Sequence, residues 1–183
     1  MMRYANTILV VEDDANDRAL IELAFRKVGV TGPIHLLSSG EEAIAYMMGE
    51  GPYADRVKYA YPSFIMTDLK MPGADGFAVL EHLKNNPEWA IVPAVVLSGS
   101  SDVDDIRTAY LLGASTYHVK PSGLDALERL LRVLHEYWMT CEIPEVELSG
   151  RHIRTHPHGK LGHRFPQPAR ARQARAARRP TNS

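Results

Sequence analysis

The chain has 183 residues, of which 45% are hydrophobic, and its net charge is −1 at pH 7. This length suits one ordinary domain plus an extension, and the hydrophobic fraction is typical of a globular protein. No apolar run approaches the ~20 residues that span a bilayer, and the first run is too short for a signal peptide. The single cysteine, Cys141, cannot form an internal disulfide. We therefore expect a cytoplasmic protein without membrane insertion.

Charge is unevenly distributed along the chain. Residues 1–150 contain 12 Lys/Arg and 22 Asp/Glu, a net charge of −10. Residues 151–183 contain 9 Lys/Arg and no acid, a net charge of +9. We therefore predict a folded domain at 1–140 and a C-terminal extension at 141–183, which is basic and disordered from about residue 150.

Short apolar runs and amphipathic stretches alternate along the first 138 residues. Strands are predicted at 7–11, 34–37, 63–67, 92–97 and 115–119. Helices are predicted at 16–28, from a capping box at 39–42 to 48, at 77–86, at 102–112 and at 124–138. Residues 49–62 are expected to form a long loop. This alternation favours an α/β fold, in which a parallel sheet carries helices on both faces.

Polar and charged side chains follow four of the five predicted strands. Glu12 and Asp13 follow the first strand, Asp68 the third, Ser98 the fourth and Lys120 the fifth. Sites in parallel α/β sheets form at the carboxyl ends of the strands. These groups are therefore expected at one edge, although periodicity alone does not give the strand order.

The chemistry of these groups is mutually compatible. Carboxylates that share a pocket repel one another, and Mg²⁺ relieves that repulsion and neutralises a phosphoryl group during transfer. A carboxylate such as Asp68 can act as the nucleophile and form an aspartyl-phosphate. Lys120 would supply a fixed positive charge and Ser98 a hydroxyl donor. Gly99 would leave open space for a bulky phosphoryl donor.

Each residue taken alone has a simpler interpretation. An acid after a strand is often a loop or helix-cap residue, and Asp13 could favour the start of the following helix. Ser98 could be an ordinary turn residue, and Lys120-Pro121 is a common surface dipeptide. Because the compatible groups occur together, at the ends of four strands, we favour a shared site.

The sequence resembles the receiver domains of response regulators, from residue 7 to about residue 138. Four motifs carry the resemblance: ILVVEDD at 8–14, TDLKMPGADG at 67–76, VLSG at 96–99 and GASTYHVKP at 113–121. It implies a doubly wound, flavodoxin-like (βα)5 fold with a five-stranded parallel sheet in the order 2-1-3-4-5. The long 49–62 connection is similar to that of single-domain receivers that partner bacterial phytochromes and hybrid histidine kinases.

The resemblance also implies roles for individual residues. Asp68 would be the phospho-acceptor, and Lys120 would pair with the phosphoryl group. The Mg²⁺ ligands would be Asp13, Asp68, Glu12 through water, and the backbone carbonyl of Lys70. The side chain of Lys70 is an unusual choice at this position and would alter the lifetime of the phosphoryl group.

A second set of residues would transmit the signal. Ser98 would move toward the phosphoryl group and Tyr117 would change rotamer in response, with Gly99 and Pro121 beside them. The face formed by the fourth helix, fifth strand and fifth helix is where such domains commonly dimerise or meet targets.

We therefore predict a phospho-accepting response regulator that takes its phosphoryl group from a histidine kinase or a histidine phosphotransfer protein. It would modify itself and slowly hydrolyse its aspartyl-phosphate, so it is not expected to be an enzyme in the usual sense. Three alternatives stay open: a degenerate receiver that only binds partners, a nucleic-acid-associated protein acting through its basic tail, and a hydrolase. Any nucleic-acid binding by the tail is expected to be weak and sensitive to salt.

Overall fold

The computed structural model describes residues 7–141, apart from the side chain of Met139. Five parallel strands form one sheet in the order β2-β1-β3-β4-β5, which confirms the predicted fold. The strands are β1 (Ile8–Val11), β2 (Ile34–Leu37), β3 (Phe64–Thr67), β4 (Ala94–Ser98) and β5 (Thr116–Val119). The helices are α1 (Ala15–Lys27), α2 (Gly40–Met48), α3 (Gly76–Asn85), α4 (Val103–Leu111) and α5 (Leu124–Thr140), with a short 3-10 helix η1 (Gly51–Tyr53).

The basic extension lies outside the described residues, so its predicted boundary and disorder stay predictions. Within 7–141, no helix is both long enough and apolar enough to cross a membrane.

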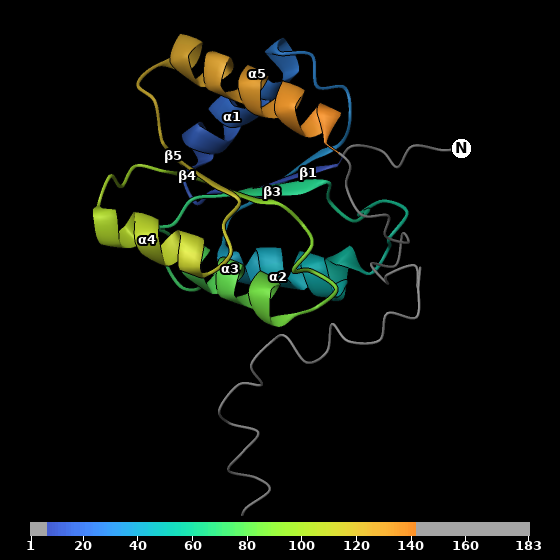
Figure 1. Ribbon diagram of the computed structural model, residues 1–183. Coiled ribbons are helices and arrows are strands. Elements are labelled where there is room, and N and C mark those ends of the chain that lie inside the picture. Colours follow the sequence, from blue (N-terminus) through green and yellow to red (C-terminus); the bar gives the residue numbers. More distant parts are fainter. Residues whose placement is uncertain (1–6, 142–183) are drawn as a thin grey trace, which may run out of the picture. The chain divides into compact units, whose positions relative to one another are not determined.

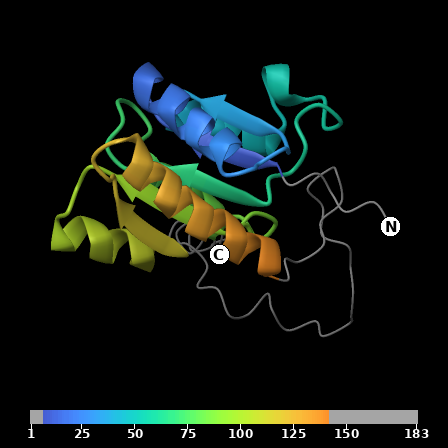
Figure 2. The same cartoon turned by 90° about the horizontal axis from the view of Figure 1, so that it is seen from above.

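Helices cover both faces of the sheet (Figure 1). α1 and α5 lie side by side on one face, and α2, α3 and α4 cover the other. Figure 2 shows α1 and α5 from above, packed over the strands. Two apolar cores result: a first core between the sheet and α2, α3 and α4, and a second core between the sheet and α1 and α5. Strands β1, β3 and β4 are buried throughout, as their continuous apolar runs predict.

The apolar stripes of α1 and α5 form the second core. In α5 the side chains of Leu127, Leu131 and Leu134 are buried. In α1 the side chains of Ile21 and Phe25 are buried. The C-terminal edge of the sheet, where the strands end, carries the candidate site.

The loop after β3 is so tightly folded that there is no room for a side chain where it meets α3. Gly76 begins α3, and a Cβ atom placed there would lie 2.0 Å from the backbone oxygen of Asp68. Gly40 begins α2 and donates its backbone N–H to the carbonyl of Ala74 at 3.0 Å. The loop that carries Asp68 is therefore fixed against the first turns of two helices.

The prediction of a simple loop at 49–62 is incomplete. Residues Gly51–Tyr53 form η1, and the Tyr53 ring packs against Tyr46 of α2 with centroids 5.2 Å apart. Arg56 donates hydrogen bonds to the backbone carbonyls of Tyr46, at 2.8 Å, and of Met47. These carbonyls belong to the last turn of α2, where helix carbonyls run short of intrahelical donors, and the Tyr46 carbonyl also accepts the N–H of Gly49 at 3.2 Å. The connection is thus anchored on α2 by aromatic packing and by an arginine cap, which hydrophobic periodicity does not reveal.

Candidate functional site

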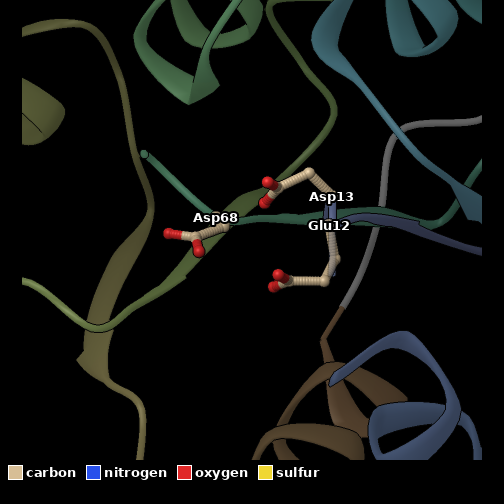
Figure 3. Close-up of side chains that lie close together, drawn as sticks. All are labelled: Glu12, Asp13 and Asp68. Carbon is tan, nitrogen blue, oxygen red and sulfur yellow. The ribbon is translucent and has the colours of Figure 1, made fainter. Parts of the chain in front are cut away.

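Three carboxyl groups converge at the C-terminal edge of the sheet. β1 and β3 are hydrogen-bonded neighbours with Val11 paired to Thr67, so the residues that follow the two strands meet. One carboxylate oxygen each from Glu12, Asp13 and Asp68 lies within 4.8 Å of the others. Figure 3 shows Glu12 and Asp13 reaching from the end of β1 toward Asp68. The structure therefore brings together the carboxylates that the sequence predicts for a metal site, which we call the acidic cluster.

Lys120 is the cation of this cluster. Its Nζ lies 2.8 Å from a carboxylate oxygen of Glu12, 2.9 Å from one of Asp68 and 2.8 Å from one of Asp17. Burial of the ammonium disfavours its charged form, but the hydrogen bonds to Asp17, Glu12 and Asp68 outweigh this and raise the pKa of Lys120. Lys120 therefore carries its positive charge at neutral pH.

Glu12 is the most deeply buried member of the cluster, with 2% of its surface exposed. Burial raises the pKa of Glu12, because the ionised carboxylate loses hydration, although the neighbouring Lys120 ammonium acts in the opposite direction. A buried carboxylate of this kind needs a cation beside it. Oxygen ligands from a few carboxylates, completed by water, are what Mg²⁺ prefers, so the donor set fits a divalent cation.

The two oxygens of Asp68 have different surroundings. Oδ1 accepts backbone N–H groups from Leu69 at 2.5 Å and from Lys70 at 3.3 Å, whereas Oδ2 faces Lys120. The carboxylate is thus oriented from one side by amides and from the other by an ammonium. Both kinds of donor can stabilise added negative charge at this position. The proposed role of the Lys70 carbonyl as a metal ligand stays a prediction.

Ser98 and Tyr117 lie on the neighbouring strands β4 and β5. Ser98 is fully buried at the end of β4, and its hydroxyl oxygen is 3.5 Å from the backbone nitrogen of Ser100. Tyr117 packs against the first core, and its hydroxyl donates a hydrogen bond of 2.9 Å to the carbonyl of Ser100. Both predicted switch residues therefore contact the same residue of the β4–α4 loop.

Gly99 and Pro121 lie in different environments. A Cβ atom at Gly99 would meet no other atom within 4 Å, so the predicted open space beside Ser98 is present. Pro121 lines a cavity of about 190 Å³ between α1 and the start of α5, together with Asp17 and Lys120. The structure thus places Pro121 on the side of the second core, whereas Tyr117 packs against the first.

Sequence reasoning missed three residues near the site: Asp17, Ser100 and Asp105. Asp17 contacts Lys120, and Asp105 of α4 lies 2.9 Å from the Nζ of Lys70 and accepts a hydrogen bond of 2.6 Å from the Ser100 hydroxyl. In the sequence, Asp17 and Asp105 look like ordinary acids in the first turn of a helix. Only the fold reveals which lysine each one meets.

Comparison with known proteins identifies the domain. Residues 8–132 match the family of response regulator receiver domains. The chain belongs to this family. Among curated proteins, the receiver is 35% identical to the probable methanogenesis regulatory protein FilR2 of Methanothrix harundinacea, over 72% of this chain and 83% of that protein. It is 30% identical to the response regulator Rcp1 of Synechocystis sp., over 75% of this chain and 92% of Rcp1.

A solved structure extends the likeness to phytochrome systems. The phosphorylated cyanobacterial phytochrome response regulator RcpA matches 77% of this chain and 99% of its own, with 33% identity and a TM-score of 0.71. The predicted similarity to phytochrome-partner receivers is therefore confirmed. The receiver is a signalling domain of two-component systems and not a conventional enzyme, and its acidic cluster can hold a divalent metal ion, as receiver domains do.

Proposed function

We propose that this receiver accepts a phosphoryl group on Asp68 from a phosphohistidine, with Mg²⁺ held by Glu12, Asp13, Asp68 and the Lys70 carbonyl. The observation that supports this most directly is the placement of the Asp68 carboxylate against Lys120, within 4.8 Å of Glu12 and Asp13. The bound cation would neutralise charge on the transferred group. The residues of the chain would contribute by positioning the nucleophile and the charges around the phosphoryl group.

In the transfer, a carboxylate oxygen of Asp68 attacks phosphorus and forms the acyl phosphate bond. The phosphorus–nitrogen bond of the donor breaks, and its electron pair stays on the imidazole nitrogen. Lys120 balances the charge that develops on the phosphoryl oxygens. The same site would then slowly transfer the phosphoryl group to water, which releases inorganic phosphate and regenerates the Asp68 carboxylate.

The test is labelling of the purified full chain with acetyl phosphate, followed by intact mass. Wild type should gain one phosphoryl group in Mg²⁺ and none in excess EDTA. Asp68→Asn should fold but gain none, whereas Asp75→Asn, which alters the acid that caps α3 in the same loop, should label like wild type. Full labelling of Asp68→Asn would exclude Asp68 as the acceptor. An unlabelled wild type would favour the degenerate receiver, which only binds partners.

We further propose that the donor is a histidine kinase of phytochrome type or a histidine phosphotransfer protein. The support is similarity to RcpA, which is itself a phytochrome response regulator. Phosphotransfer profiling against the histidine kinases of the same genome tests this. Preferential and rapid labelling by a kinase without a phytochrome module would contradict the assignment.

The output surface is proposed to be the face formed by α4, β5 and α5, through which two copies would associate. Large apolar side chains are exposed on all three elements: Val103, Tyr110 and Leu111 on α4, Val119 on β5, and Val133 and Tyr137 on α5. Light scattering of wild type and Leu111→Asp, each with and without acetyl phosphate, tests the association. A dimer that is unaffected by Leu111→Asp would place the interface elsewhere.

A further inference from the structure

The ammonium of Lys120 is shared among three carboxylates that belong to two different groups. An ammonium has three N–H donors, and here each of the three contacts goes to a different acid. Glu12 and Asp68 are members of the acidic cluster. Asp17 is not: it belongs to the first turn of α1 and approaches Lys120 from the helix side.

A divalent cation in the acidic cluster would compete with this ammonium. Mg²⁺ takes carboxylate oxygens as ligands, and two positive centres that share the same oxygens repel each other. Cation binding therefore weakens the contacts of Lys120 with Glu12 and Asp68. Asp17 is the one acceptor of the three that a cation in the cluster leaves available.

Asp17 also has the freedom that this requires. Its side chain is 40% exposed, whereas that of Glu12 is 2% exposed and fixed in place. Asp17 and Lys120 both line the cavity of about 190 Å³ beside α1, whose remaining walls are mostly apolar. The cavity gives the ammonium room to move toward Asp17 without leaving the site.

We propose that Asp17 is a positioning residue, which receives the Lys120 ammonium when Mg²⁺ enters the acidic cluster. Asp17 thereby strengthens metal binding and keeps Lys120 within reach of a phosphoryl group on Asp68. This inference rests on the proposed Mg²⁺ site. Without Asp17, the ammonium stays on Glu12 and Asp68 and opposes the cation.

Two simpler roles of Asp17 make a different prediction. An acid in the first turn of a helix favours the helix N-terminus, and any nearby negative charge attracts a cation. Neither effect depends on Lys120. The dependence of the Asp17 effect on Lys120 therefore separates the positioning role from both.

The experiment is a double-mutant cycle on Mg²⁺ affinity, measured by calorimetry on the unphosphorylated full chain. Asp17→Asn should weaken Mg²⁺ binding about three- to tenfold when Lys120 is present, and no more than about twofold in a Lys120→Met background. Asp17→Glu should restore most of the affinity. Glu22→Gln, which removes an acid from the same helix at an exposed ion pair with Arg26, should change affinity less than about twofold. Circular dichroism checks that every variant is folded.

Equal weakening by Asp17→Asn in both backgrounds would overturn the positioning role while leaving the Mg²⁺ site intact. Failure of wild type to bind Mg²⁺ would overturn the metal site, and the positioning role with it. The two failures are therefore distinguishable.

Discussion

The hydroxyl of Tyr117 and the carbonyl of Ser100 join β5 to the β4–α4 loop through a hydrogen bond of 2.9 Å. The Ser100 hydroxyl continues the connection to Asp105 of α4, and Asp105 binds Lys70 of the loop that carries Asp68. A continuous set of polar contacts thus runs from the acceptor loop to the edge of the sheet. It passes beside the buried hydroxyl of Ser98.

Ser98→Ala should separate phosphorylation from the response. The variant should still accept a phosphoryl group, at a rate reduced by no more than about tenfold, because Asp68 and Lys120 are untouched. It should show little change at α4, since the moving hydroxyl is absent and a switch needs contacts that differ between its two states. Hydrogen exchange of residues 103–111, with and without acetyl phosphate, measures this. Equal changes in Ser98→Ala and wild type would contradict the coupling.

Asp105→Asn should loosen α4 with little effect on global stability. The Lys70–Asp105 ion pair is partly exposed and screened by water, so its loss should change the free energy of unfolding only slightly. Hydrogen exchange at the start of α4 should nevertheless accelerate, because Asp105 also holds the Ser100 hydroxyl. Urea unfolding and exchange measured on the same samples give both values. Arg107→Gln, which removes the exposed ion pair with Asp104, is the control and should leave exchange near Ser100 unchanged.

Stability should fall as the pH decreases from about 7.5 to about 5.5, in part because three histidines are partly buried and favour the neutral ring. Burial lowers the pKa of His35, His82 and His118 below 6.5. As the pH falls, protons therefore bind these histidines in the unfolded chain first. The contribution of the three neutral rings to the free energy of unfolding is fully present above pH 6.5 and is lost as the pH falls toward the folded pKa values. His35 packs against the rings of both Tyr46 and Tyr59, so His35→Phe keeps an aromatic ring there. Urea titrations should show a weaker pH dependence for His35→Phe than for wild type; identical slopes would refute this.

Arg56→Ala should destabilise the domain by about 1–3 kcal/mol, because the carbonyls of Tyr46 and Met47 lose the hydrogen bonds from the guanidinium. Arg56→Lys should recover only part of the loss, since one ammonium cannot reproduce the two-pronged geometry of a guanidinium. Chemical denaturation of the two variants measures the difference. Equal stability of Arg56→Lys and wild type would show that charge alone fixes the 49–62 segment.

A chain that ends at Ser149 should keep its fold and its rate of phosphorylation. The removed residues include all of 151–183, whose net charge of +9 comes from 9 Lys/Arg without any acid. Nucleic-acid binding by the full chain should be weak, independent of sequence and abolished by moderate salt, because it would depend on counterion release. Gel shifts at two salt concentrations compare the two chains. Salt-resistant, sequence-selective binding would instead identify the tail as an output element.

Much of the fold was predictable because periodicity depends on burial. Every predicted strand and helix is present, and β4 differs only in running from Ala94 through Ser98. One of the two hydrogen bonds of the predicted capping box is present. Ser39 accepts the N–H of Glu42, but the Glu42 carboxylate reaches back to the N–H of Ser38 and not to that of Ser39. Such a choice between adjacent donors depends on geometry that residue types do not encode.

The site was predictable to the extent that it lies at strand ends. Glu12, Asp68, Ser98 and Lys120 each follow or end a strand, so a parallel sheet in the right order brings them together. Asp17, Ser100 and Asp105 approach from helices and loops, where position depends on how α1 and α4 pack. Lys70 illustrates the same limit, because its side chain turns to Asp105 and to the ring of Phe77.

The contact between Glu12 and Lys120 also constrains the order in which this chain can fold. Glu12 is buried beside β1, yet its cation comes from the residue that follows the last strand. A partly folded chain with β1 and β3 paired, but with β5 not yet in place, would hold a buried carboxylate without its ammonium, which is costly. Early pairing of the central strands is therefore penalised until the final βα unit docks. The charges of the acidic cluster thus favour all-or-none folding of the whole sheet.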